Sequence, residues 1–320
     1  MEEKYKKIIN KIKQANNILL VAHNRPDGDA VASLCAVSML IESFDKNYRA
    51  YTHDEPPKQF SYLKNYEKII FDKSKINFKN FDLIITLDCG HLSRTKLVDE
   101  INTRISKQYV AEIDHHPKLH DYTDLEIRDE SASSTCEIIY NIITYNKIQV
   151  NKDLATAILT GIMTDTGNFF YDLTTEKTIQ AASEMMRYGA RFPLILENTW
   201  RNKSINGMKI WGIAMRRLYV NSKYNMAVTV LTRQDFVDTG ATDEEMEGIP
   251  GFLSGIADAD TLLVLRELDD GTIKGSLRSM NKKKDISKLA GKLGGGGHLM
   301  ASAFAMDVRI KKEGTRWKID

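Results

Sequence analysis

Three apolar segments in the first half of the chain run directly into acidic or histidine side chains. Segment 17–22 (NILLVA) is followed by His23, segment 83–88 (LIITLD) ends on Asp88, and segment 109–114 (YVAEID) ends on Asp114. Continuously apolar strands separated by helical stretches indicate a parallel sheet that is covered on both faces. Ligand sites of such open sheets lie outside the carboxyl ends of the strands. We therefore expect these side chains to meet at one edge of the sheet.

The rest of the pattern predicts an α/β protein with two domains, which suits a length of 320 residues. In the first domain we expect a further strand over 48–52 and helices over 29–44, 133–147, 152–164 and 175–189. Residues 190–222 are helical in pattern and predict a linker. Strands over 226–231, 261–268 and 273–279 and a helix over 285–293 predict a smaller α/β domain. The expected boundaries are 1–189, 190–222 and 223–320.

Composition argues against several classes of protein. A net charge of +2 is too small for a protein that coats nucleic acid through bulk electrostatics. Three cysteines without a C-x-x-C pair argue against a disulfide framework and a zinc-thiolate site, and they indicate a reducing compartment. The longest uncharged apolar run, residues 30–41, is too short to span a bilayer. We expect a soluble, cytoplasmic protein without a membrane partner, and the sequence leaves a homodimer open.

More ligand-type side chains surround the three strand ends. Asp27 and Asp29 follow His23 within one short loop, and His115 and His116 follow Asp114. So many acids at one edge repel one another unless a cation binds among them. Imidazoles and carboxylates without a thiolate suit Mn²⁺ first, with Mg²⁺, Co²⁺ or Fe²⁺ as competitors. An EF-hand calcium loop does not fit, because Val31 and Ser33 occupy its next ligand positions.

The charged residues of the second half are unevenly distributed. Residues 235–270 hold eleven acidic residues and one basic residue, whereas residues 273–320 hold twelve basic and four acidic ones. The basic block indicates an anion-facing surface, although two solvated faces of opposite sign would give the same pattern. The run 294–297 (GGGG) in this block matches neither a dinucleotide fingerprint nor a Walker A loop. Its backbone N–H groups could cradle an anion together with Arg278.

Taken together, six motifs resemble the DHH phosphoesterase family with an appended DHHA1 domain, and within it the two-domain nanoRNase type. These are H-N-R-P-D-G-D-A at 23–30, D-C-G at 88–90, D-H-H at 114–116, G-I-M-T-D-T-G at 161–167, G-S-L-R-S at 275–279 and G-G-G-G-H at 294–298. They span almost the whole chain. Ala32, Leu299, Met300 and Ala303 depart from the family's pattern. The fold implied is a parallel-sheet DHH domain with helices on both faces, followed by a smaller α/β DHHA1 domain.

The resemblance also implies a site with two metal ions, usually Mn²⁺. One ion would bind His23, Asp27 and Asp88, and the other Asp29, Asp88, His115 and Asp165. Asp88 would bridge the two ions, Asp114 would orient its neighbours, and His116 would contact the scissile phosphate. Ser276, Arg278 and the turn at Gly297-His298 would hold the rest of the substrate.

The expected activity is hydrolysis of very short oligonucleotides to nucleoside monophosphates, of 3′-phosphoadenosine-5′-phosphate (pAp) to AMP, or of both. The substrate is then a short oligonucleotide or a nucleotide bisphosphate. Two alternatives stay open at this point. The same chemistry could act on pApA from cyclic-dinucleotide turnover, or the chain could be a catalytically inert module that binds nucleotides or RNA.

Overall fold

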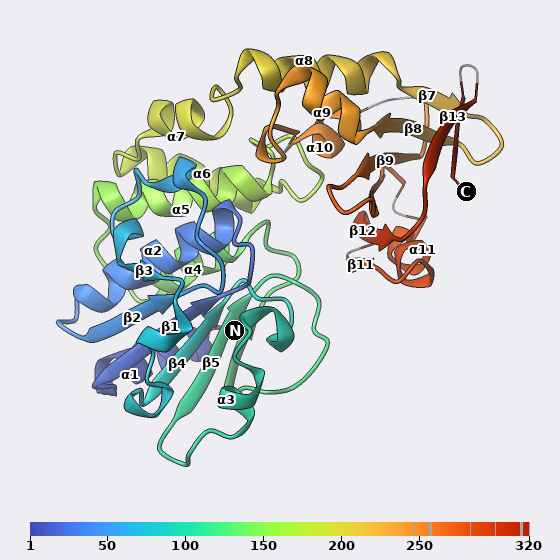
Figure 1. The fold of residues 1–320 in the computed structure, drawn as a ribbon. Coiled ribbons are helices and arrows are strands. Elements are labelled where there is room, and N and C mark those ends of the chain that lie inside the picture. Colours follow the sequence, from blue (N-terminus) through green and yellow to red (C-terminus); the bar gives the residue numbers. More distant parts are fainter. Residues whose placement is uncertain (247, 256–257, 282, 298, 314–315, 320) are drawn as a thin grey trace. The chain divides into compact units, whose positions relative to one another are not determined.

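The structure is a computed structural model that describes residues 1–246, 248–255, 258–281, 283–297, 299–313 and 316–319. Its backbone divides into two compact units, Met1–Arg201 and Asn202–Asp320 (Figure 1). Within the described residues, no helix combines the length and apolar character that crossing a membrane requires. Each unit has its own sheet and is described by itself.

The first unit is built on a six-stranded parallel sheet with the strand order β3-β2-β1-β4-β5-β6. The strands are β1 (Asn17–Ala22), β2 (Asn47–Tyr51), β3 (Ile69–Ile70), β4 (Leu83–Leu87), β5 (Tyr109–Asp114) and β6 (Leu125–Arg128). In the register, Ala22 pairs with Leu87 and Leu87 pairs with Ile113. The three strands that end in acids or histidine are therefore neighbours, and they end level with one another, as the sequence predicts.

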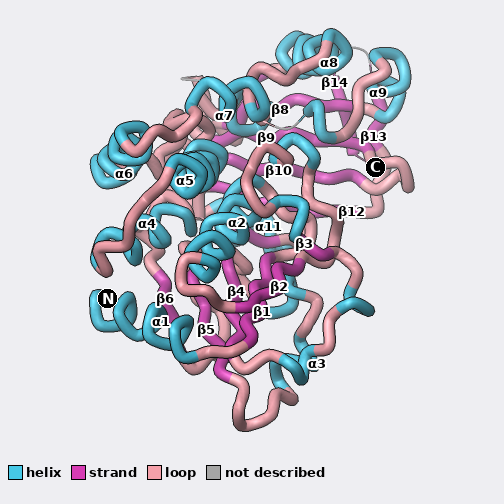
Figure 2. Tube along the Cα trace, turned by 90° about the vertical axis from the view of Figure 1, so that its left-hand side faces the viewer, coloured by secondary structure: helices cyan, strands magenta, loops and turns pink. Residues whose placement is uncertain are grey.

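Both faces of this sheet are covered, which explains why the central strands β1 and β4 are apolar along almost their whole length. Ile18 and Leu20 belong to the core beneath the larger helices, while Leu19 and Val21 belong to the core on the opposite face. Figure 2 shows α2, α4 and α5 together on one side of the strands. The helices of this unit are α1 (Glu2–Gln14), α2 (Gly28–Glu42), α3 (Val98–Asn102), α4 (Thr135–Tyr145), α5 (Lys152–Asp165), α6 (Glu176–Arg187) and α7 (Phe192–Thr199).

Helix α2 lies deepest, and every residue from Gly28 to Ile41 is buried. It packs closely against α5 and α4, and Gly161 of α5 makes the approach possible. A Cβ atom at Gly161 would lie 2.3 Å from Cys136 Sγ and 2.4 Å from Asp29 Oδ1. These separations are below van der Waals contact, so no larger residue fits there without displacing Asp29 or Cys136.

The second unit contains a mixed sheet with the strand order β11-β12-β10-β9-β8-β7. Its strands are β7 (Tyr219–Asn221), β8 (Met226–Leu231), β9 (Thr261–Glu267), β10 (Ile273–Ser279), β11 (Gly296–Gly297) and β12 (Ala301–Met306), with a separate hairpin of β13 (Ile310–Glu313) and β14 (Arg316–Ile319). Its helices are α8 (Ile205–Arg216), α9 (Arg233–Thr239), α10 (Ile249–Leu253) and α11 (Ile286–Lys292). The predicted smaller α/β domain is confirmed. Of its strand pairs, β8 and β9 are parallel and the others are antiparallel.

The stretch 190–222 contains more than the predicted helical linker. It holds α7 in the first unit, α8 in the second, and the edge strand β7, which pairs with β8. The three-residue strand is too short to show a period of two in the sequence. The same limit hid β3 and the four-residue edge strand β6. The backbone divides into its two units between Arg201 and Asn202, which lie inside the predicted linker. The predicted domain boundaries at 189 and 223 remain predictions.

The close packing of α5 on α2 and α4 gives a test of this fold. Replacing Gly161 with Ala should lower the free energy of unfolding by about 1–3 kcal/mol, because the new methyl group overlaps buried side chains. Scanning calorimetry would measure the change. Gly212→Ala is the matched control, since a Cβ there meets nothing within 4 Å and alanine favours helix α8. Equal stability of both variants would contradict the packing described.

Candidate metal centre

The ends of β1, β4 and β5 bring acids and imidazoles into one small volume. Three sets of ligand atoms each lie within 4.8 Å of one another: His23, Asp27 and Asp88; Asp29, His115 and Asp165; and Asp88, His115 and His116. All six residues predicted as metal ligands from the resemblance are among them. The structure thus gathers residues that are up to 142 positions apart in the sequence into one cluster.

Asp88 occupies the middle of this cluster, and its two oxygens serve different neighbours. Oδ2 lies 3.8 Å from His23 Nε2, while Oδ1 lies 3.5 Å from His115 Nε2. The backbone of Asp88 is left-handed, with φ of +58°. This conformation is energetically unfavourable for a residue other than glycine, and residues that adopt it concentrate at functional sites. The carboxylate is therefore placed where it can join two ligand groups.

Two helix ends supply the second group. Asp29 is the second residue of α2, and its carboxylate accepts hydrogen bonds from the backbone N–H groups of Thr135 (2.6 Å) and Cys136 (3.1 Å). These N–H groups begin α4, where they lack helical partners and the helix dipole favours negative charge. Asp165 is the last residue of α5, and its Oδ2 lies 3.1 Å from His115 Nε2.

Asp27 has a structural role in addition to its place in the first group. It caps helix α2, because its side chain accepts a hydrogen bond from the Ala30 backbone N–H at 3.1 Å. Its other oxygen, Oδ2, lies 3.5 Å from His23 Nε2. One carboxylate oxygen thus fixes the helix start and the other faces the cluster.

The hydrogen bonds of His23 determine which of its nitrogens can bind a metal. His23 Nδ1 lies 2.7 Å from the backbone carbonyl oxygen of Asn24, and a carbonyl oxygen accepts only, so Nδ1 carries the hydrogen. The lone pair is then on Nε2. This atom is buried and has no hydrogen-bond partner among the described residues, although it faces Asp27 and Asp88. A buried lone pair facing two carboxylates suits a cation.

Asp114 lies next to the cluster and holds His116, which belongs to the third set of ligand atoms. Asp114 accepts hydrogen bonds from the Gly90 N–H (2.6 Å), the His116 N–H (2.8 Å) and His116 Nδ1 (2.9 Å). Burial alone would raise the pKa of Asp114, but the His116 hydrogen bonds and the nearby Arg128 charge hold it below its usual range. Asp114 thus stays ionised and fixes the orientation of the His116 ring.

The pKa values of Asp88, Asp29 and Asp165 are instead raised. Asp27 resembles Asp114, because His23 holds its pKa below the usual range against the effect of burial. Burial and the negative charges of Asp29, Asp27, Asp165 and Asp114 raise the pKa of Asp88 well above its ordinary value. Burial and the charge of Asp27 raise the pKa of Asp29 to about 6. Without a cation, the cluster therefore takes up protons to reduce repulsion. Divalent cations would neutralise the same charges, and the donor set of histidines and aspartates can hold them.

Three residues that the sequence reasoning missed also belong to the site. The Thr135 hydroxyl donates to Asp88 Oδ1 at 3.0 Å. Arg128 donates to the His116 carbonyl oxygen and pairs with Glu112 at 2.7 Å. Arg94 lies beside Asp27 and Cys89. Ser134 and Thr135 at the start of α4 indicate a helix start, but nothing in the pattern shows that the Thr135 hydroxyl faces Asp88.

The predicted substrate residues lie in the second unit. Ser276 and Arg278 are two apart on β10 and therefore share one face of the strand, where Arg278 Nη1 donates to the Leu277 carbonyl oxygen at 2.9 Å. Gly297 pairs with Ser302, and a Cβ there would lie 2.6 Å from the Ala301 carbonyl oxygen. Close approach of β12 therefore requires this glycine. His298 lies outside the described residues.

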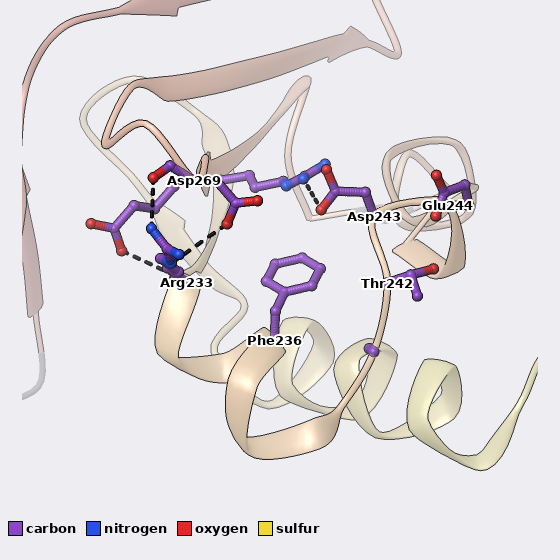
Figure 3. Close-up of a pocket in the computed structure, with 9 residues that line it drawn as sticks. Arg233, Phe236, Thr242, Asp243, Glu244 and Asp269 are labelled. Carbon is purple, nitrogen blue, oxygen red and sulfur yellow. Dashed lines mark hydrogen bonds and ion pairs between the residues drawn. The ribbon is translucent and has the colours of Figure 1, made fainter.

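The second unit also has a cavity of about 340 Å³ that the sequence did not predict. Figure 3 shows Arg233 paired with Asp269 of the same cavity. The other arginine of the lining, Arg266, pairs with Asp243. Four acids of the block 235–270 line it, so part of that block is explained by these ion pairs. Its lining does not include Ser276 or Arg278.

Comparison with known families agrees with the fold and the cluster. The family model of the DHH family N-terminal domain matches residues 17–162, and that of the DHHA1 domain matches residues 223–313. The chain therefore contains a DHH-family N-terminal domain followed by a DHHA1 domain. The DHH match covers the sheet and the helices of the cluster up to α5. The resemblance predicted from the motifs is confirmed.

Known relatives are similar over nearly their whole length. The bifunctional oligoribonuclease and PAP phosphatase NrnA of Bacillus subtilis is 28% identical, with 93% of this chain and 92% of the relative covered. A probable NrnA of Streptococcus mutans is also 28% identical, with 93% and 92% covered. The crystal structure of an exopolyphosphatase-related protein from Bacteroides fragilis matches with a TM-score of 0.86 and 26% identity, covering 95% of this chain and 91% of that one.

The raised pKa values predict how stability depends on pH in metal-free protein. The folded-state pKa values of Asp88 and Asp29 exceed those of the unfolded chain, so folding favours the protonated forms. The free energy of unfolding should then fall as the pH rises from about 4 through the raised pKa values, by ~1–3 kcal/mol. Thermal unfolding after chelation would measure this fall.

Asp88→Asn and Mn²⁺ provide the controls. The substitution removes one buried charge, so the metal-free variant should melt higher than the metal-free wild type above pH 6. Mn²⁺ should raise the melting temperature of the wild type and reduce its pH dependence. An identical pH profile for both proteins, with and without Mn²⁺, would contradict the electrostatic account.

Proposed function

We propose that this protein is a metal-dependent phosphoesterase that hydrolyses very short oligonucleotides to nucleoside monophosphates and pAp to AMP. The observation that carries the proposal is the shared carboxylate of Asp88, whose two oxygens face two different ligand groups. Enzymes that hydrolyse phosphoesters commonly hold two cations in this way. The relatives named above as oligoribonucleases and PAP phosphatases support the choice of substrate.

The proposed ligands follow the geometry of the cluster. His23, Asp27 and Asp88 would hold one Mn²⁺, and Asp29, Asp88, His115 and Asp165 would hold the other, with Mg²⁺ or Co²⁺ as alternatives. A bound pair of such ions supplies a nucleophilic hydroxide near neutral pH and neutralises charge on the phosphoryl oxygens. The start of α4 keeps Asp29 in place through two backbone hydrogen bonds.

His116 has the geometry of a residue that contacts the scissile phosphate. Its Nδ1 lies 2.9 Å from Asp114 Oδ1, and an ionised carboxylate accepts only, so Nδ1 carries a hydrogen. Nε2 is then the nitrogen that can exchange a proton with the substrate, and we propose that it serves the leaving oxygen. Asp114 acts by orienting this ring. The rest of the nucleotide would be bound by residues of the DHHA1 domain, namely Ser276, Arg278, Gly297 and His298. We also propose that the protein works in the cytoplasm.

Replacing Asp88 with Ala should abolish hydrolysis, because the variant loses the carboxylate shared by both ligand groups. We expect turnover to fall by at least ~10³-fold. A product time course with Mn²⁺ on pAp, pApA and a labelled pentanucleotide measures this fall and also ranks the substrates. Asp99→Ala, an exposed change in α3, is the control with unchanged activity.

Two results would overturn the proposal. Near-wild-type turnover by Asp88→Ala would remove the assigned role of the shared carboxylate. Wild-type protein that binds nucleotide without Mn²⁺-dependent cleavage of any of the three substrates would instead indicate an inert binding module. If pApA is cleaved much faster than pAp and the pentanucleotide, the substrate is the dinucleotide of cyclic-dinucleotide turnover.

A further inference from the structure

The turn after β4 carries a guanidinium group to the rim of the cluster. Arg94 lies in a short 3-10 helix, Leu92–Thr95, six residues after Asp88. Its carbonyl oxygen accepts a hydrogen bond from the Asn24 N–H at 2.7 Å, which joins this turn to the loop that follows His23. The backbone of Arg94 is thus fixed between the two loops that supply the first ligand group.

The side chain of Arg94 extends toward His116. A Cβ atom at Gly90 would lie 3.4 Å from Arg94 Nη1 and 3.3 Å from His116 Cγ, so the guanidinium and the imidazole flank the same glycine. Gly90 has a φ of +65°, which glycine adopts without strain. The charge of Arg94 also reaches Asp27, whose pKa it helps to lower against the effect of burial. The guanidinium therefore lies near both a proposed metal ligand and the proposed phosphate-contacting residue.

Most of the hydrogen-bonding capacity of Arg94 is not used within the described residues. Among the described residues, the guanidinium makes one hydrogen bond, from Nη1 to the Cys89 carbonyl oxygen at 3.4 Å, and it forms no ion pair with a carboxylate. Arg128 shows the contrast, because Glu112, Glu126 and the His116 carbonyl oxygen engage its guanidinium. Arg94 is also only half-buried, so a ligand can reach it.

We propose that Arg94 binds the scissile phosphate of the substrate, together with His116, which approaches the same position at Gly90. This inference rests on the proposed phosphoesterase function and adds a residue to its phosphate-binding site. A guanidinium offers paired N–H donors that match the oxygens of a phosphate group, and it remains charged throughout the reaction. Arg94 would hold the phosphate in place, and it takes no part in proton transfer.

A purely structural role for Arg94 makes a different prediction. If its charge only offsets the neighbouring acids or holds the turn, its loss would disturb the ligand loops and thereby Mn²⁺ binding. If it binds phosphate, its loss removes a cation from the rim and leaves Mn²⁺ affinity unchanged or tighter. Metal affinity and phosphate affinity therefore separate the two roles.

The test compares the wild type with Arg94→Gln, Arg94→Lys and the exposed control Arg49→Gln. Calorimetry in Mn²⁺ would measure the binding of AMP, which carries the scissile phosphate after oligonucleotide cleavage, and of adenosine, which lacks it. We expect Arg94→Gln to weaken AMP binding by about 10- to 100-fold and adenosine binding hardly at all. Arg94→Lys should recover part of the loss, and Mn²⁺ affinity, followed by electron paramagnetic resonance, should not fall.

Unchanged AMP affinity in Arg94→Gln would overturn the inference, as would a parallel loss of Mn²⁺ affinity. Either result can be told apart from failure of the proposed function, because that failure shows in the wild type as an absence of hydrolysis. With hydrolysis intact, the steady-state constants give a second readout. Loss of a phosphate contact made before and during the reaction should raise KM in Arg94→Gln relative to Arg49→Gln.

Discussion

The mutual repulsion of buried carboxylates is the constraint on which the rest of the first unit depends. Asp29, Asp88 and Asp114 are each at most 2% exposed, and two of them belong to the candidate ligand groups. Hydrogen bonds within the protein stabilise two of these negative charges. The Thr135 N–H at the start of α4 donates to Asp29, and His116 donates to Asp114. Burial and the remaining repulsion from the neighbouring carboxylates raise the pKa of Asp88, and a pair of dications would neutralise these charges.

Helix packing, as well as the strand ends, positions the candidate metal-binding side chains. Asp29 is fixed by its place on the buried helix α2 and by the N–H groups of α4, while Gly161 keeps α5 close enough for Asp165 to reach His115. The site is therefore carried by regular elements, and a ligand placed by a helix or strand end is more precise than one placed by a flexible loop. The positions of the candidate ligands and the packing of the core therefore depend on the same few contacts.

Part of this site could be predicted from the sequence, and the limit has a physical basis. Apolar strands that end in His23, Asp88 and Asp114 identify one sheet edge, because parallel strands end together. Asp165 has no such local signal, and only the resemblance pointed to it. Thr135 and Arg94 could not be found, since side-chain direction across long sequence distances depends on tertiary packing. Gly295 and Gly297 allow close packing against β12, a role that the sequence does not separate from anion binding.

Anomalous scattering from crystals soaked in Mn²⁺ tests the central claim most directly, because it locates each ion relative to the side chains. The account predicts two peaks in each chain, one beside His23 and Asp27 and the other beside His115 and Asp165, with the Asp88 carboxylate between them. In Asp88→Asn crystals, at least one of the two peaks should weaken. An empty cluster in soaked wild-type crystals, or ions bound only elsewhere, would contradict it.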